Sequence, residues 1–335
     1  MLPALTKALL RDYGFRIYYY GNFASEDSLT GQDIYRGEPK GESKEPKIWR
    51  AFSPQPRVGF NYVGLRNRLF ILSEAYSYLD FRRRIAVTGA FVTEILKYAA
   101  ANGAAIRRLT READARGGAS SSPVRVGPAS RERQIAVQYT PKALPKPVTI
   151  LVGEVVKKTN PLSGYEMTAM VENAVTPVKM LDYGLFVAAR SVPIARAYLI
   201  PHKEEMGAIV EKLQGHGIVV EELASPLTTD VEKFTVEKVT RSPRRIQGHD
   251  NVKVAWRSEE EKMRFEPGTY FVRTSQPLGL LAAYLLEPES DDGLVAWNFL
   301  DAFLEPQKVL PVYKLMRAGD LKRVETRKLE IRRKT

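Results

Sequence analysis

The sequence contains no cysteine and only three histidines, His202, His216 and His249. Without cysteine the chain can form neither disulfides nor thiolate metal sites, and it has no cysteine nucleophile. No apolar run approaches the ~20 residues that a membrane-spanning helix requires, so we expect no membrane span. The first residues, MLPALTKALLRDYG, lack the apolar stretch and cleavage site of a signal peptide, which leaves the compartment open.

Basic residues exceed acidic ones, at 51 against 39, which gives a formal charge of +12. Such an excess permits binding to polyanions or membrane surfaces. The charge is dispersed, however, except in the segment LKRVETRKLEIRRKT at 321–335. We therefore interpret the charge as a solvated basic surface and expect no nucleic-acid partner.

The 335 residues, 44% of them hydrophobic, suffice for roughly two domains. Early in the chain the pattern predicts an α-helix at 4–13, a strand in FRIYYYG and a surface loop at 21–47. A second strand is predicted at 69–75. A helix is predicted from Phe81 to about Ala101, with Asp80 as its N-cap. Beyond about 133 short strand-like runs dominate, with one helix at 203–214. The fold class is therefore α/β, with a mixed sheet and helices at 1–115, a linker at 116–132, a β-rich accessory domain at 133–320 and a basic tail at 321–335.

Glu74 ends the apolar run LFIL, where an ionised carboxylate is unusual. In a strand, Glu74 would share one face with Phe70, Leu72 and Tyr76 and would lie at the carboxyl end, where α/β sheets collect ligands. A partly desolvated glutamate has a raised pKa and suits a general base. The alternative is a structural glutamate that pairs with Arg66 or Arg68.

Two segments resemble one known family. The string NYVGLRNRLFILSEAYSYLDFRRRI at 61–85 is similar to the last part of the catalytic domain of zinc carboxypeptidases, especially bacterial members. The string LLEPESDDGLVAWNFLD at 285–301 resembles the carboxy-terminal extension of larger bacterial members. The resemblance implies that 1–115 is the carboxy-terminal portion of a carboxypeptidase-like mixed sheet, and that the substrate is a peptide or a peptidoglycan-type polymer.

The resemblance also implies roles for particular residues. Glu74 would be the general base and acid that takes a proton from a zinc-bound water and gives it to the leaving amine. Tyr62 lies in the region where relatives carry a tyrosine that covers the substrate, and Arg66 and Arg68 would contact substrate. The pair Asn67-Arg68 resembles the family's carboxylate-binding Asn-Arg pair, but it follows the expected place of the last zinc ligand instead of preceding it.

The family binds zinc through an early His-x-x-Glu and a later histidine, and no histidine precedes Glu74 here. His202 and Glu205 formally match His-x-x-Glu, but an acidic residue in the first turn of an amphipathic helix is expected without any metal. His216 and His249 are predicted in turns. We therefore expect zinc in the intact family member, none in this chain, and little activity from the chain by itself.

Two alternatives stay open. The chain could be a non-catalytic binding module, or a pseudoenzyme, that recognises a polymer or a protein partner. The acidic residues Glu287, Glu289, Asp291 and Asp292 could bind calcium, although a polar turn that caps the helix LVAWNFLDAFL fits their spacing better. Family relatives are often exported, and the sequence does not decide the localisation of this chain.

Overall fold

A computed structural model describes residues 1–24, 48–118, 133–317, 319, 321 and 324–329. The chain forms two compact units that alternate along the sequence. The first comprises 1–54, 70–108 and 140–187, and the second comprises 55–69, 109–139 and 188–335. The predicted fold class, a mixed α/β region followed by a β-rich region, is confirmed. The predicted domain boundaries stay a prediction, and most of the predicted linker lies outside the described residues.

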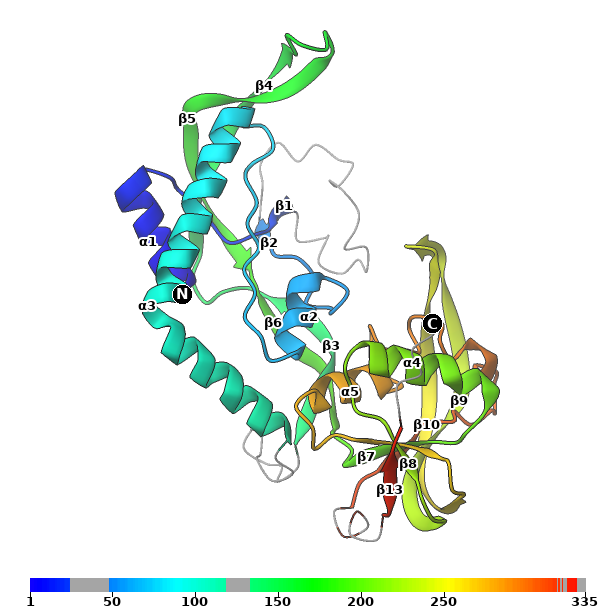
Figure 1. Ribbon diagram of the computed structural model, residues 1–335. Helices are drawn as coiled ribbons and strands as arrows, with labels where there is room; N and C mark the ends of the chain where they lie inside the picture. The colour runs from blue at the N-terminus through cyan, green and yellow to red at the C-terminus, as the bar shows by residue number, and fades with distance from the viewer. Residues whose placement is uncertain (25–47, 119–132, 318, 320, 322–323, 330–335) are drawn as a thin grey trace. The chain divides into compact units, whose positions relative to one another are not determined.

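The first unit contains a four-stranded sheet in the order β1-β2-β5-β4. Its strands are β1 (Asn22–Ala24), β2 (Ile48–Arg50), β4 (Val148–Thr159) and β5 (Glu166–Tyr183). The short β2 runs parallel to the end of β5, with Ile48 opposite Leu181, and the other neighbours are antiparallel. The long pair β4 and β5 forms the bent ribbon that Figure 1 draws in green.

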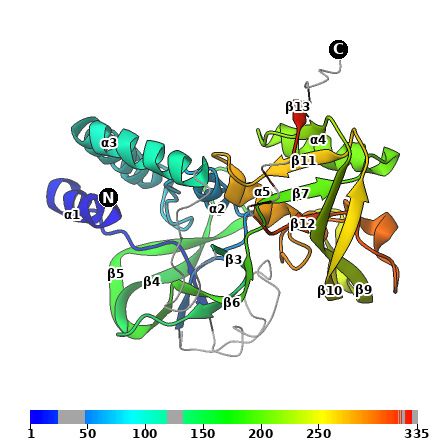
Figure 2. The same ribbon diagram turned by 90° about the horizontal axis from the view of Figure 1, so that it is seen from below.

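Two helices of the first unit, α1 (Leu2–Tyr13) and α3 (Phe81–Gly118), lie side by side in Figures 1 and 2. Leu5 and Leu9, which lie four residues apart on one face of α1, are buried in one cluster with Ala90 and Phe91 of α3. The predicted helix at 4–13 is thus confirmed. The predicted cap of α3 is also confirmed, since the Arg83 N–H donates to Asp80 Oδ1 at 2.9 Å. The helix continues beyond the predicted end at Ala101, and its last residues belong to the second unit.

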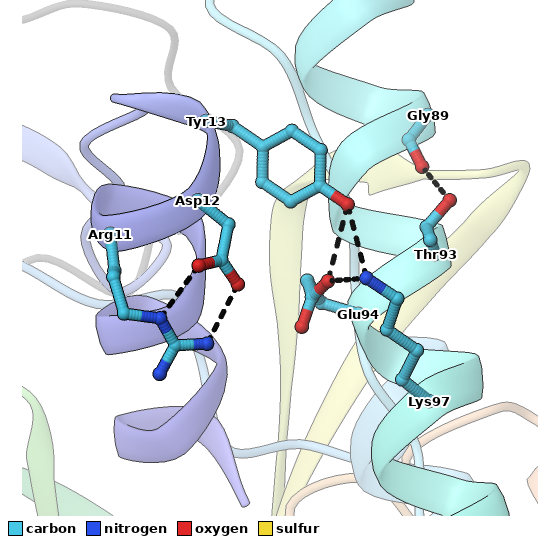
Figure 3. Close-up of polar contacts among 7 residues, drawn as sticks. All are labelled: Arg11, Asp12, Tyr13, Gly89, Thr93, Glu94 and Lys97. Atoms are coloured by element: carbon cyan, nitrogen blue, oxygen red, sulfur yellow. Dashed lines mark hydrogen bonds and ion pairs between the residues drawn. The ribbon is translucent and has the colours of Figure 1, made fainter.

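A polar contact also joins these two helices (Figure 3). The Tyr13 hydroxyl donates to Oε1 of the buried Glu94 at 3.2 Å, and Lys97 Nζ lies 2.7 Å from the same oxygen. The Glu94 carboxylate in turn raises the pKa of Lys97. A buried carboxylate needs such partners, so the contact fixes how α1 packs on α3.

The second unit contains a seven-stranded antiparallel sheet in the order β10-β9-β12-β7-β11-β8-β13. Its strands are β7 (Ala197–Ile200), β8 (Glu221–Leu223), β9 (Leu227–Ile246), β10 (His249–Phe265), β11 (Tyr270–Arg273), β12 (Tyr313–Leu315) and β13 (Thr326–Lys328). The hairpin between β9 and β10 turns through Gln247 and Gly248, both at positive φ. The strand β13 lies within the predicted basic tail at 321–335 and pairs with β8.

Short helices complete the second unit: α2 (Gly59–Leu65), α4 (Gly207–Gly215), α5 (Gly279–Leu286) and two 3₁₀ turns, Glu204–Met206 and Asp301–Phe303. Apolar residues of α4 and α5 pack with those of the sheet into one core. The remaining strands, β3 (Gln134–Lys142) and β6 (Leu185–Pro193), pair with each other and contribute residues to both units. Within the described residues, no helix combines the length and apolarity that crossing a bilayer requires.

Three predicted elements are wrong. Residues 69–75 belong to no strand, and FRIYYYG at 15–21 likewise lies outside any strand. The alternation in 70–76 was nevertheless correct, because Phe70, Leu72, Glu74 and Tyr76 are exposed whereas Ile71 packs on the core of α1 and α3. The predicted helix LVAWNFLDAFL is a series of turns that ends in the 3₁₀ turn Asp301–Phe303.

Candidate functional site

Glu74 belongs to the first unit, where its side chain is exposed. The backbone N–H of Met170 in β5 donates to the Tyr78 carbonyl at 2.8 Å, which ties the end of this segment to the sheet. The Tyr20 hydroxyl donates a hydrogen bond to the Glu74 carboxylate. Partial burial, followed by the negative charge of Glu74, raises the pKa of Tyr20. Glu74 is thus a solvent-accessible carboxylate oriented by one neutral phenol.

Tyr62 and Arg66 belong to the second unit and meet at His216. The Tyr62 hydroxyl lies 2.7 Å from His216 Nδ1. Arg66, which caps the end of α2 four residues after Tyr62, donates to that hydroxyl at 3.0 Å and also to the His216 carbonyl. Burial, and then the charges of Lys212 and Arg66, lower the pKa of His216. The arrangement holds the Arg66 guanidinium in a fixed position.

Arg68 pairs with Asp114 of α3 at 2.9 Å. Asn67, the residue before Arg68, donates to Asp114 at 3.2 Å and to the Pro277 carbonyl at 2.8 Å. Asn67 has φ 59°, a left-handed conformation that asparagine tolerates better than most residues. The neighbouring Arg68 guanidinium lowers the pKa of Asp114.

Arg66 and Arg68 line one open cleft of about 360 Å³ in the second unit, together with Asp114, Gly217, Val219, Gln276, Pro277 and Leu278. Two hydrogen bonds hold Gln276 in this lining: its side-chain amide accepts from Val219 N at 2.7 Å and donates to the Val219 carbonyl at 3.1 Å. The cleft therefore combines two guanidinium groups with an apolar wall. A ligand that carries a carboxylate beside an apolar group matches this lining.

The three histidines are held in separate environments of the second unit. His202 lies against the Tyr270 ring with centroids 5.2 Å apart, His216 contacts Tyr62, and His249 Nδ1 lies 3.3 Å from Asn298 Oδ1. Across 1–24, 48–118 and the described residues after 132, no three His, Cys, Asp or Glu side chains are grouped so that they could hold a metal ion. The residues of the described structure therefore do not fit a catalytic zinc.

The four acidic residues at 287–292 point to different partners. The pairs are Glu287 with Lys314, Glu289 with Arg190, Asp291 with the Tyr284 hydroxyl, and Asp292 with Arg57. Burial raises the pKa of Asp291 and of Asp292, and each pairing compensates a desolvated carboxylate. Because these carboxylates do not converge, the geometry gives no support to the calcium alternative.

Sequence reasoning missed several residues that position the candidate side chains. Tyr20 was assigned to a strand, and Asp114 was not singled out. Each is distant in sequence from the residue that it contacts, so no local spacing could have identified it. The tyrosine-rich string before residue 21 was the one available signal for Tyr20.

Comparison with curated proteins shows that the chain is similar to Carboxypeptidase 2 of Trichophyton rubrum, with 31% identity over 129 residues. The matched region is 38% of this chain and 23% of that relative, so the chain spans less than a quarter of the relative's length. No family model matches the chain, and no solved structure matches it. The similarity supports a carboxypeptidase-like relationship, and the relative is fungal.

Proposed function

We propose that the chain is part of a zinc-dependent carboxypeptidase that acts on a peptide or peptidoglycan-type substrate, with Glu74 as its proton-transfer group. The observation that carries the proposal is the similarity to Carboxypeptidase 2, together with the motif at 61–85 that leads to Glu74. In the proposal, zinc is held by polypeptide outside these 335 residues, because the resemblance requires histidine ligands before the catalytic glutamate and no histidine precedes Glu74. The chain by itself is then metal-free and inactive.

Glu74 and Tyr20 have the chemistry that this role needs. The Glu74 carboxylate is exposed, so water or a substrate can reach it and exchange a proton with it. The hydrogen bond from Tyr20 leaves the carboxylate acceptor sites that a second donor can use. Tyr20 is thus a positioning residue, and Glu74 is the group that would touch the reacting atoms.

The test measures zinc content and hydrolysis of an N-acylated dipeptide, first with the 335-residue chain and then with the protein produced from the gene including the coding DNA upstream of Met1. We expect no stoichiometric zinc and no zinc-dependent hydrolysis from the chain. In the longer protein, Glu74→Gln should lower kcat by about 100-fold or more, whereas the control Glu154→Gln, an exposed glutamate of β4, should not.

Two outcomes contradict the proposal. Zinc-dependent hydrolysis by the 335-residue chain, lost in Glu74→Gln, would overturn its predicted inactivity. A longer protein that binds zinc and hydrolyses the dipeptide equally well with Glu74→Gln would remove Glu74 from the reaction.

The cleft at Arg66 and Arg68 favours a second candidate function, a non-catalytic module that binds a polymer or peptide through a carboxylate. Titration calorimetry with an acetylated peptide ending in leucine tests it against the same peptide with a terminal amide. We expect the free acid to bind more tightly, and Arg68→Gln to weaken it while the exposed control Arg264→Gln does not. Equal affinity for acid and amide would exclude carboxylate recognition.

A further inference from the structure

Three neighbouring strands of the second unit, β12, β7 and β11, end together at one end of the sheet (Figure 2). Ala197, the first residue of β7, pairs with the last residue of β11, Arg273, and with the last residue of β12, Leu315. The residues just beyond these strand ends are therefore neighbours in space. They are Arg196, Thr274 and Met316.

A small cavity lies at this end of the sheet, within the second unit. Its volume is about 30 Å³, and its lining includes Arg133, Arg196 and Ser275 together with the apolar Ile194 and Met316. A cavity of this volume has room for about two water molecules or for one small anion. It is too small to enclose a nucleotide or a peptide.

Hydrogen bonds of the sheet hold the cavity in place. The Ile194 N–H donates to the Arg133 carbonyl at 2.8 Å, which joins the residue after β6 to the residue before β3. The Thr274 N–H donates to the Arg196 carbonyl at 3.1 Å, and the buried Thr274 hydroxyl donates to the Ala195 carbonyl at 2.6 Å. A ligand would therefore meet a preformed site.

The two arginines of the cavity carry like charges close together. Burial, followed by the positive charge of Arg196, lowers the pKa of Arg133. None of the described residues that line the cavity is acidic. An anion in the cavity would lower the repulsion between the two guanidinium groups. The planar guanidinium also matches the oxygens of an oxyanion, with which it can form two parallel hydrogen bonds.

We propose that this cavity binds one small inorganic oxyanion of the phosphate or sulfate type through Arg133 and Arg196. The Ser275 hydroxyl would donate a further hydrogen bond to the anion. The positive charge of the site disfavours a metal cation, and its volume disfavours a larger organic acid. The inference goes beyond the proposed function, since it involves neither Glu74 nor zinc.

Calorimetric titration of the 335-residue chain with inorganic phosphate, at constant ionic strength and without sulfate, tests the proposal. Arg196→Gln removes one guanidinium group. Ser275→Val fills part of the cavity and keeps both arginines, so it decides the outcome if Arg196→Gln does not fold. The controls are Arg264→Gln, at an exposed arginine of β10, and Arg68→Gln, in the open cleft. Circular dichroism checks the fold of each variant.

We expect one phosphate per chain, with an affinity that Arg196→Gln and Ser275→Val each lower at least about tenfold and that both controls leave within about twofold. No binding, or binding that persists in Arg196→Gln and Ser275→Val, would overturn the inference. Binding that only Arg68→Gln removes would assign the anion to the cleft and overturn it as well. Phosphoserine should bind more weakly than phosphate, and tighter binding would overturn the assignment to a free anion.

Discussion

Lys314 Nζ lies 3.1 Å from Glu287 Oε1 in the core of the second unit, and the two side chains are 2% and 0% exposed. The Tyr198 hydroxyl donates to the same carboxylate oxygen at 2.6 Å, and Glu232 Oε2 lies 3.1 Å from Lys314. Burial raises the pKa of Glu287, and the charge of Lys314 opposes that shift. The buried ion pair therefore avoids a large desolvation cost only while Lys314, Glu287 and their hydrogen-bond partners are all present.

Lys314→Met should lower the free energy of unfolding by about 3–5 kcal/mol, because it leaves Glu287 buried without its cation. Urea unfolding measures the change. The double variant Lys314→Met with Glu287→Gln should recover part of the loss, since it buries no net charge. Arg264→Ala, which breaks the exposed pair with Glu266, serves as the control and should cost about 1 kcal/mol or less. Equal losses in the free energy of unfolding for Lys314→Met and Arg264→Ala would contradict this account.

Acidification should destabilise the protein through His216. The pKa of His216 is lowered in the folded chain, so between the folded and unfolded pKa values the unfolded state binds more protons. The contribution of His216 is complete above the ordinary histidine pKa of about 6.5 and declines as the pH falls below it. Thermal unfolding between pH 8 and pH 5 should show this decline, and His216→Gln should flatten it. The control His249→Gln should leave the decline in stability with falling pH unchanged. If His216→Gln also leaves that decline unchanged, His216 is not its source.

The N-cap of α3 can be tested by a conservative pair of substitutions. Asp80→Ala removes the acceptor for the Arg83 N–H and should cost about 1 kcal/mol of stability. Asp80→Asn should cost much less, because asparagine caps helices about as well as aspartate. Chemical denaturation of the two variants distinguishes a cap from a merely charged surface residue. A large loss in Asp80→Asn would show that the negative charge matters more than the cap.

A side chain at Gly217 should destabilise the fold, although the space beside the residue is adequate. Its φ is +81°, and a Cβ there would lie 3.6 Å from Leu278 Cδ1, an ordinary contact. The cost of Gly217→Ala therefore comes from the left-handed backbone, about 1–2 kcal/mol. The control Gly215→Ala lies within α4 and should be neutral or stabilising, since alanine favours helix. Urea unfolding of both variants measures the contrast, and a similar effect at the two positions would contradict it.

Local sequence signals predicted the elements whose stability is local. The buried leucines Leu5 and Leu9 of α1, the cap at Asp80 and the helix that ends at Gly215 each follow from spacing within a few residues, and each is confirmed, whereas Leu10, expected on the same face, is exposed. The run at 69–75 was predicted as a strand because its composition is apolar. A strand also needs a neighbour in register, and composition contains no information about that neighbour.

In the candidate site, too, local sequence patterns identified individual residues but not the distant residues that contact them. Arg66 and Arg68 were singled out from sequence, and the structure places both on one cleft, but their partners His216 and Asp114 come from distant positions. Glu74 was singled out because it ends an apolar run. Tyr20, which contacts Glu74, lies in a different part of the chain, so the local pattern around Glu74 could not identify it. The roles of Glu74, Tyr62, Arg66 and Arg68 in binding or catalysis stay predictions.

The pairing of β2 with β5 has a consequence for biosynthesis. Residues 48–50 find their parallel partners at 181–183, so β2 remains without that neighbour until the ribosome has translated past Tyr183. Contacts between such remote positions close late and slow folding. The nascent amino-terminal half would then emerge with an unfinished sheet, a state in which chaperone binding would prevent aggregation.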